Sequence, residues 1–248
     1  MHLTTKALVL REVNYKESDK ILTLLTAEEG KLTVSARGCR KKGSALAAAG
    51  QLLVWSEMTL YEYQGRWAVK EAVTDLLDNR DGLMCGICNG FQALIKLGLV
   101  PYGKIIDTDE NCPTLTFNNI NRHQSRIVHT RIASTKSPWL SLMNVGDVVN
   151  VPISHGEGKF LCSPELALQL AENGQIATQY VDLEGNPTNG INFNPNGSLF
   201  AIEGITSPDG RVFGKMGHSE RIADGLYRNV PGEYDIRMFE AAVKYFKG

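Results

Sequence analysis

The chain has 248 residues, 43% of them hydrophobic, which is enough to bury a core in one large domain or two small ones. Charged residues make up 21% and the net charge is −1, which excludes a disordered chain and a globally basic nucleic-acid binder. No run of about 18 apolar residues is present, and the first residues lack a secretory apolar segment. The five irregularly spaced cysteines predict free thiols rather than a disulfide framework. We therefore expect a cytoplasmic protein that does not span a membrane.

Residues 1–77 have the pattern of a small antiparallel β-barrel. Short apolar or alternating stretches, separated by turns that contain glycine, are found at residues 21–26, 32–36, 52–63 and 67–69. Several short strands at this spacing are typical of a barrel that closes on itself.

Residues 78–248 mix strand and helix patterns. Strands are predicted at residues 83–87, 126–132, 148–153 and 177–181. Helices are predicted at residues 90–97, 163–174 and 236–246, with Gly98 as a C-terminal stop for the first and Ser163-Pro164 as a start for the second. Alternating elements of this kind predict an α/β fold, so we expect two domains with their boundary between residues 77 and 78.

The segment Gly86-Ile87-Cys88-Asn89-Gly90 has the pattern of a nucleophile elbow, because it lies between a short apolar strand and a helix. A sharp strand-to-helix turn exposes the cysteine, and the helix N-terminus favours its thiolate. The glycines permit the tight geometry. The backbone N–H of Asn89 is then a candidate donor to an oxyanion.

A cysteine nucleophile also needs a base, and the best candidate among the five histidines is His218. Glu220 follows two residues later, so its carboxylate can orient the imidazole ring, as in catalytic triads. His155, followed by Glu157, is the other histidine with a nearby carboxylate. Its place at the end of a predicted strand favours a structural or substrate-loop role.

Two other interpretations of the cysteine are open. A cysteine flanked by apolar residues is commonly a buried core residue. Cys85 and Cys88 also form a C-x-x-C pair, which occurs in redox and metal sites. No second pair of ligands has zinc spacing, so we expect no metal.

Residues from about 80 to the end resemble the class I glutamine amidotransferases, and in particular the C-terminal glutaminase domain of phosphoribosylformylglycinamidine synthase. The resemblance is carried by the Cys88 and His218 motifs and by segments at residues 122–126, 137–139, 155–160, 179–182, 194–198, 204–205 and 209–211. It implies that Cys88 is the nucleophile, His218 the base and Glu220 its orienter, with Asn89 at the oxyanion. It further implies that Gln92 and His155 contact the glutamine substrate, and that no cofactor is needed. The ammonia would serve an ATP-dependent amidation in purine biosynthesis.

The resemblance also implies missing parts. The family has a Gly-Gly-Phe-Ser-Tyr-Gly-like loop before the nucleophile, and residues 1–79 contain no such loop. That loop supplies an oxyanion donor, and loss of one donor lowers the rate by about 10²–10³-fold. The ATP-dependent synthetase domain is absent as well. We therefore expect a partial domain with weakened glutaminase activity.

Residues 1–77 resemble the N-terminal domain of the RecO family of recombination mediators. The resemblance is carried by segments at residues 5–11, 15–21, 24–31, 36–42, 60–62 and 70–72. It implies an OB-fold that binds single-stranded DNA through a basic groove and stacking aromatic rings. The candidate contacts are Arg37, Arg40, Lys41 and Lys42, with Tyr61, Tyr63 and Trp67. The alternative is a solvated basic loop beside aromatic rings that pack the barrel.

The chain therefore resembles the N-terminal part of one protein fused to the C-terminal part of another. A recombined gene, a deliberate chimera and a mis-joined gene would all have this pattern. Three hypotheses follow: a glutamine amidotransferase with a Cys-His-Glu triad, a DNA-binding OB-fold of recombination and repair, or a pair of partial domains without activity.

Overall fold

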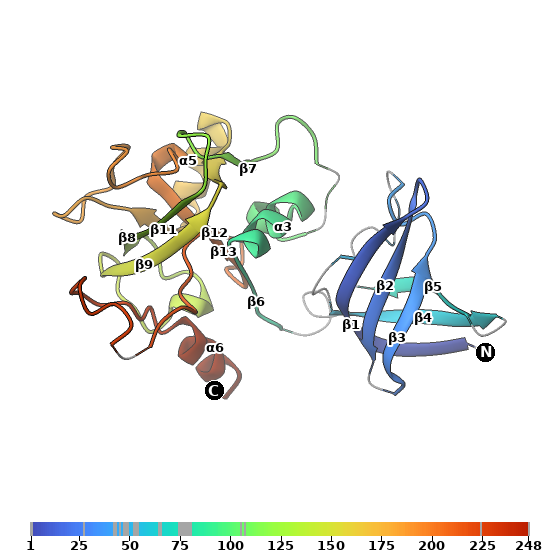
Figure 1. Cartoon of the computed structure of the whole chain (residues 1–248). Coiled ribbons are helices and arrows are strands. Elements are labelled where there is room, and N and C mark those ends of the chain that lie inside the picture. Colours follow the sequence, from blue (N-terminus) through green and yellow to red (C-terminus); the bar gives the residue numbers. More distant parts are fainter. Residues whose placement is uncertain are drawn as a thin grey trace. The chain divides into compact units, whose positions relative to one another are not determined.

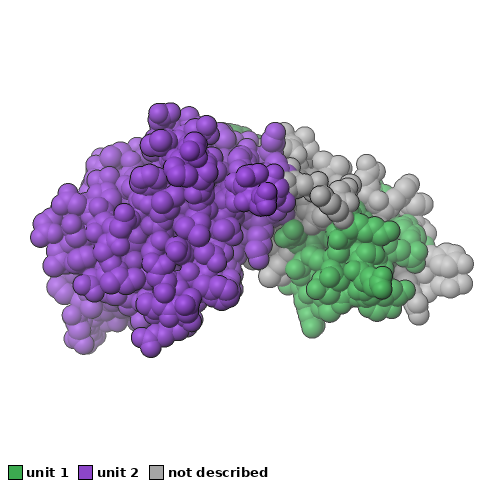
Figure 2. Space-filling view, turned by 90° about the horizontal axis from the view of Figure 1, so that it is seen from above, with its two compact units in different colours: residues 1–83 green, residues 84–248 purple. Residues whose placement is uncertain are grey.

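A computed structural model gives the structure of the chain. It describes residues 2–26, 28–41, 44, 46, 50–51, 55–63, 66–73, 81–104, 106, 108–223 and 225–247. The chain divides into two compact units, residues 1–83 and 84–248, which are green and purple in Figure 2. The boundary that we expected between residues 77 and 78 lies outside the described residues. Within the described ranges, no helix combines the length and hydropathy needed to cross a bilayer.

The first unit is a closed β-barrel (Figure 1). Its strands are β1 (His2–Tyr15), β2 (Asp19–Thr26), β3 (Gly30–Ala36), β4 (Trp55–Tyr63) and β5 (Arg66–Val73). The order around the barrel is β1-β2-β3-β5-β4, and β4 pairs with β1 to close it. The predicted small barrel is confirmed, but it is not wholly antiparallel, because β3 and β5 run parallel.

Alternate residues of the barrel strands point inward and form its core. The pairs Leu22 and Leu24 on β2 and Met58 and Leu60 on β4 are at most 1% exposed, as the period of two predicts. Strand β1 was not among the predicted strands, although it is 14 residues long. Its first part pairs with β4 and its second part with β2, with an irregularity in register after Val9.

The second unit is built on a six-stranded sheet with the order β6-β13-β12-β11-β8-β9 (Figure 1). Its strands are β6 (Met84–Ile87), β8 (Gln124–Ile132), β9 (Val148–His155), β11 (Ile176–Tyr180), β12 (Ile202–Thr206) and β13 (Val212–Lys215). A separate pair joins β7 (Thr114–Phe117) to β10 (Glu157–Leu161). The four strands predicted in this unit are confirmed within a few residues at each end. The mixture with helices confirms the α/β class.

Two helix ends of the second unit coincide with the capping residues that the sequence carries, Gly98 and Ser163. They are α3 (Asn89–Leu97), α4 (Leu99–Tyr102), α5 (Pro164–Glu172) and α6 (Met238–Lys247), with the short 3₁₀ helices η1 (Pro138–Leu140) and η2 (Leu199–Ala201). Gly98 ends α3 in the left-handed conformation, with φ of 79°. The Ser163 hydroxyl caps α5 by accepting a hydrogen bond from the N–H of Leu166. The three predicted helices are thus confirmed.

The parallel strands β6 and β13 determine where the segments that contain Cys88 and His218 meet. β6 pairs with β13, so that Ile87 lies beside Lys215. The chain leaves β6 into α3 and leaves β13 toward residue 218 at the same end of the sheet. Helix α3 packs on this pair, with the Phe91 ring against Gly214. A Cβ atom at Gly214 would lie 2.1 Å from Cδ2 of Phe91.

This close approach predicts that Gly214→Ala is destabilising. The added methyl group meets a ring that is fully buried, so the free energy of unfolding should fall by about 1–3 kcal/mol. Gly90→Ala is the matched control, because no atom lies within 4 Å of a Cβ there. It should leave stability unchanged or raise it by up to about 1 kcal/mol. Urea unfolding measures both, and equal stability of the two variants would contradict the packing argument.

Candidate active site

Cys88 occupies a sharp turn between β6 and α3. Its backbone has φ of 55° and ψ of −108°, a conformation that side-chain-bearing residues rarely adopt. Its N–H donates to the carbonyl oxygen of Lys215 at 2.9 Å, and its own carbonyl accepts from the N–H of Gln92 at 3.1 Å. Gly86 allows the chain to fold back this tightly, because a Cβ atom there would lie 2.6 Å from the backbone of Gly90.

The surroundings of the Cys88 thiol act on its ionisation in opposite directions. Burial raises the pKa of the thiol, and the carboxylate of Glu220 raises it further. The backbone N–H of Asn89, which hydrogen-bonds the sulfur, and the charge of Arg221 both lower this pKa. The sulfur also lies 3.8 Å from the carbonyl oxygen of Ser154. Burial is the largest of these causes, so the pKa of the Cys88 thiol stays above its ordinary value and the resting sulfur carries a proton that a base must remove.

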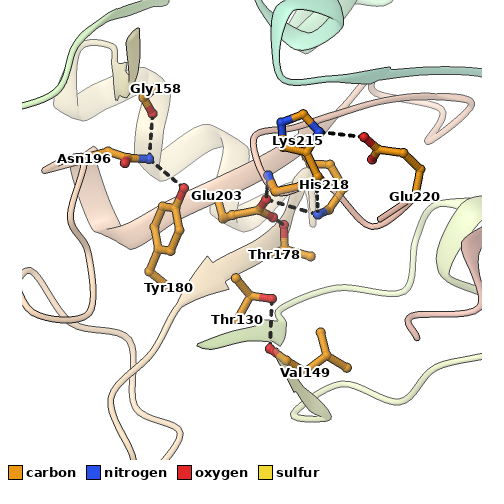
Figure 3. A network of polar contacts seen from close by, with 11 residues as sticks. Thr130, Val149, Gly158, Thr178, Tyr180, Asn196, Glu203, Lys215, His218 and Glu220 are labelled. Atoms are coloured by element: carbon orange, nitrogen blue, oxygen red, sulfur yellow. Dashed lines mark hydrogen bonds and ion pairs between the residues drawn. The ribbon is translucent and has the colours of Figure 1, made fainter. Parts of the chain in front are cut away.

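His218 follows β13 and is held on both sides. Its backbone N–H donates to the carbonyl oxygen of Pro152 at 2.8 Å. Its Nδ1 lies 2.6 Å from Oε1 of Glu220, a contact that Figure 3 shows. With the proton on Nδ1, the neutral ring presents Nε2 as a hydrogen-bond acceptor. Nε2 has no hydrogen-bond partner within the part of the chain that the structure describes.

A cavity of about 600 Å³ lies at this end of the second unit. Its lining residues are Ile87, Cys88, Asn89, Gln92, His123, Ser154, His155, Gly156, Glu157, His218 and Arg221. Of the site residues predicted from the sequence, five are brought together here: Cys88, Asn89, Gln92, His155 and His218. Glu220 does not line the cavity but binds His218.

The two residues expected to contact substrate are placed in the cavity wall. The side-chain amide of Gln92 donates to the carbonyl oxygen of Glu157 at 2.7 Å and so ties α3 to β10. The His155 ring packs on Gly158, where a Cβ atom would lie 2.2 Å from its Cε1. Both ring nitrogens of His155 are buried without a hydrogen-bond partner among the described residues. Burial is the main cause that lowers the pKa of His155 to about 4, and the proximity of His218 is the second. The ring of His155 is therefore neutral at pH 7.

Six lining residues had not been assigned to the site from the sequence, and four of them carry polar side chains. Arg221 follows Glu220 directly in the His218 motif, and this position is the sequence signal that could have assigned it to the site. Its Nε lies 3.6 Å from the carboxylate of Glu220. Ser154 and Glu157 flank His155 in the same way. His123 carries no local signal, and it reaches the cavity because its Nε2 lies 3.0 Å from the Ser154 hydroxyl.

The two cysteines of the C-x-x-C pair, Cys85 and Cys88, lie in different environments. Burial raises the pKa of the Cys85 thiol to about 12, which disfavours a reactive thiolate there. Cys88, in contrast, lines the cavity. The described part of the chain contains no group of three His, Cys, Asp or Glu side chains that could hold a metal ion.

The basic residues that were predicted to contact DNA follow β3. Arg37, Arg40 and Lys41 are exposed, and the turn is anchored by a 2.7 Å hydrogen bond from the N–H of Gly38 to Asp19. Lys42 lies outside the described residues, as does the side chain of Tyr63. Tyr61 is half-buried. Trp67 is partly buried against the barrel core, which agrees with the alternative that this ring packs the barrel.

Comparison with known proteins shows that the chain is similar to glutamine amidotransferases. The family of CobB/CobQ-like glutamine amidotransferase domains matches residues 36–246. The phosphoribosylformylglycinamidine synthase subunit PurQ of Methanococcus maripaludis strain C7 is 40% identical over 160 residues, which are 64% of this chain and 56% of that protein. The same subunit from a Synechococcus species is 34% identical over 168 residues, 67% of this chain and 64% of that one. The chain thus spans little more than half the length of the Methanococcus relative.

Among solved structures, the chain is similar to one described as "Structure of PurLQS from Thermotoga maritima". The identity is 25%, the similarity covers 66% of this chain and 62% of that one, and the TM-score is 0.49.

The lowered pKa of His155 makes stability depend on pH. Between pH 4 and 6.5 the unfolded chain binds a proton at this residue that the folded chain does not. Stability should therefore rise with pH across this window, by about 3 kcal/mol in total. His155→Gln should flatten that slope in urea unfolding at several pH values. His129→Gln, on β8 outside the cavity, should keep it; parallel curves for the parent and His155→Gln would show that the shift is absent.

Proposed function

Because the chain belongs to the family of CobB/CobQ-like glutamine amidotransferase domains, we propose that its second unit hydrolyses glutamine at Cys88. The observation that carries the proposal is the cavity that Cys88 and His218 share, with Glu220 bound to the far side of the imidazole. A thiol that lines a cavity at an elbow, a base and an orienting carboxylate are the parts that thiol-dependent acyl transfer needs.

The geometry suggests one role for each group. Nε2 of His218 accepts the thiol proton, and the sulfur of Cys88 attacks the side-chain carboxamide carbon of glutamine. The N–H of Asn89 donates to the oxyanion that forms. The same proton passes from His218 to the leaving nitrogen, so ammonia departs and a thioester remains. Water activated by His218 then releases glutamate and restores the thiol.

Glu220 and the cavity wall support these steps. The 2.6 Å contact with Nδ1 keeps the proton on that nitrogen, leaves Nε2 free to act as the base and stabilises the imidazolium that forms. Gln92 and His155 shape the wall against which the substrate lies. The neutral ring of His155 adds no positive charge beside His218.

We further infer that the chain acts as the glutaminase part of a phosphoribosylformylglycinamidine synthase. Its curated relatives are named as a subunit of that synthase, so the acceptor of the ammonia would be a separate ATP-dependent synthetase. The five cysteines are free thiols, which suits the reducing cytoplasm. With no Gly-Gly-Phe-Ser-Tyr-Gly-like loop in residues 1–79, we expect hydrolysis to be about 10²–10³-fold slower than with a complete oxyanion hole.

Glutamate release from glutamine tests the proposed function. Cys88→Ala should reduce it to background because no thioester can form, and His218→Ala should lower it about 10²–10⁴-fold because the base is lost. Cys112→Ser is the matched control, since this thiol lies outside the cavity, and it should retain the parent rate. Labelling of Cys88 by the glutamine analogue 6-diazo-5-oxonorleucine gives a second measure. The proposal fails if the parent chain shows neither hydrolysis nor labelling.

A second function is favoured by the strand order of the first unit. We infer that the barrel is an OB-fold, because five strands in the order β1-β2-β3-β5-β4 close with β1 shared between β2 and β4. The exposed cations Arg37, Arg40 and Lys41 follow β3. Such barrels bind oligonucleotides on the face of strands 2 and 3 and by the loops between strands 1 and 2 and between strands 4 and 5. The turn after β3 adjoins the first of these loops, because the N–H of Arg40 donates to the carbonyl oxygen of Ser18 at 2.8 Å.

Binding of a fluorescent single-stranded oligonucleotide at several salt concentrations tests this function. Replacing Arg37, Arg40 and Lys41 together by Gln should weaken binding and lower the salt slope by about 2, since each phosphate contact releases counterions. Lys31→Gln is the control, because Lys31 is an exposed cation at the opposite end of β3. Absent or salt-insensitive binding by the parent chain would refute DNA binding by the barrel.

A further inference from the structure

Lys215 contacts the nucleophile segment and the base segment at once. Its carbonyl oxygen accepts the N–H of Cys88 at 2.9 Å. Its Nζ donates to the carbonyl oxygen of Gly217, also at 2.9 Å. Gly217 directly precedes His218 in the chain. The main chain of one residue therefore holds the elbow, and its side chain holds the turn that carries the imidazole.

Glu203 on β12 completes this arrangement from the neighbouring strand (Figure 3). Its Oε1 lies 3.2 Å from Nζ of Lys215 and accepts the N–H of Gly217 at 2.5 Å. Its Oε2 accepts the hydroxyl of Thr178. Its backbone carbonyl accepts the N–H of Met216 at 3.1 Å. Glu203 and Lys215 are at most 1% exposed, so water does not weaken their attraction.

The ion pair fixes the peptide groups on both sides of Gly217. The carboxylate of Glu203 binds the N–H of Gly217, and the ammonium of Lys215 binds its carbonyl oxygen. Hydrogen bonds to charged groups are stronger than those between neutral groups. A glycine that is free to rotate would leave the next residue poorly oriented. Because both polar groups of Gly217 are bound to buried charges, the backbone conformation at Gly217 is fixed, and this conformation sets the orientation of His218.

Stability alone does not account for this pair. Burying two charges removes both from water, and apolar side chains of similar volume commonly give equal or greater stability. A buried pair does, however, specify one geometry, because any other arrangement leaves a charge unpaired. The geometry specified here is the path from Lys215 to His218.

We propose that Glu203 and Lys215 are positioning residues that set the distance between Nε2 of His218 and the sulfur of Cys88, an inference that rests on the glutaminase function proposed above. Neither side chain lines the cavity, so they act through Gly217 and the Cys88 elbow. Small displacements between reacting groups have large effects on rate.

Three variants, with His218→Ala as the reference for a lost base, test the proposal with two measurements. Lys215→Met removes both Nζ contacts, and Glu203→Gln keeps an acceptor for Gly217 but removes the charge. Thr130→Val is the matched control, because Thr130 is buried in the same sheet, makes one hydrogen bond to Val149 and does not line the cavity. The measurements are kcat and KM for glutamine, and the rate of Cys88 alkylation by iodoacetamide from pH 6 to 9.

Lys215→Met should lower kcat about 10–100-fold with little change in KM, because the defect lies in proton transfer rather than in binding. Its alkylation profile should resemble that of His218→Ala. Glu203→Gln should give a smaller loss in the same direction. Thr130→Val should keep the parent profile even where its melting temperature falls.

A folded Lys215→Met variant with the parent alkylation profile and kcat would overturn the proposal. Identical alkylation profiles for the parent and His218→Ala would also overturn it, because His218 would then not act on Cys88. If Lys215→Met does not fold, Glu203→Gln decides by the same criteria. A parent chain that does not hydrolyse glutamine would refute the proposed function, while the alkylation profiles would still decide whether the pair positions His218.

Discussion

The parallel pairing of β6 with β13 is the constraint on which the second unit depends. Parallel strands end at the same edge of a sheet, so the residues that follow them meet there. Here Cys88 follows β6 and the His218 segment follows β13, although the two residues are far apart in the sequence. The elbow hydrogen bond from Cys88 to Lys215 extends the pairing by one residue. The cavity, His218 and the buried ion pair all lie around this junction.

Local signals in the sequence predicted much of this arrangement. Gly98 and Ser163 mark helix ends because their conformational and hydrogen-bonding properties act on neighbouring residues only. The Cys88 elbow was recognisable for the same reason, since a strand, a tight turn and a helix follow one another along the chain. The alternating apolar residues of β2 and β4 likewise predicted the barrel core.

What the sequence did not predict depends on contacts between distant segments. Lys215 and Glu203 look like ordinary charged residues, and only the register of β12 against β13 reveals that each neutralises the other in the core. His123 joins the cavity through Ser154 on another strand. Strand β1 was missed altogether, and its second half carries charged and exposed residues that show no clean alternation. Pairing with β2 keeps that half extended.

The backbone of Cys88 has an evolutionary consequence. A residue with a side chain held at φ of 55° and ψ of −108° is strained by about 1–3 kcal/mol, and glycine would relieve most of that strain. A lineage that no longer needed a thiol at this turn would therefore gain stability by drifting to glycine. Under the proposed function, selection for stability and selection for chemistry act in opposite directions at this one position. The cysteine is thus a residue that the fold tolerates rather than favours.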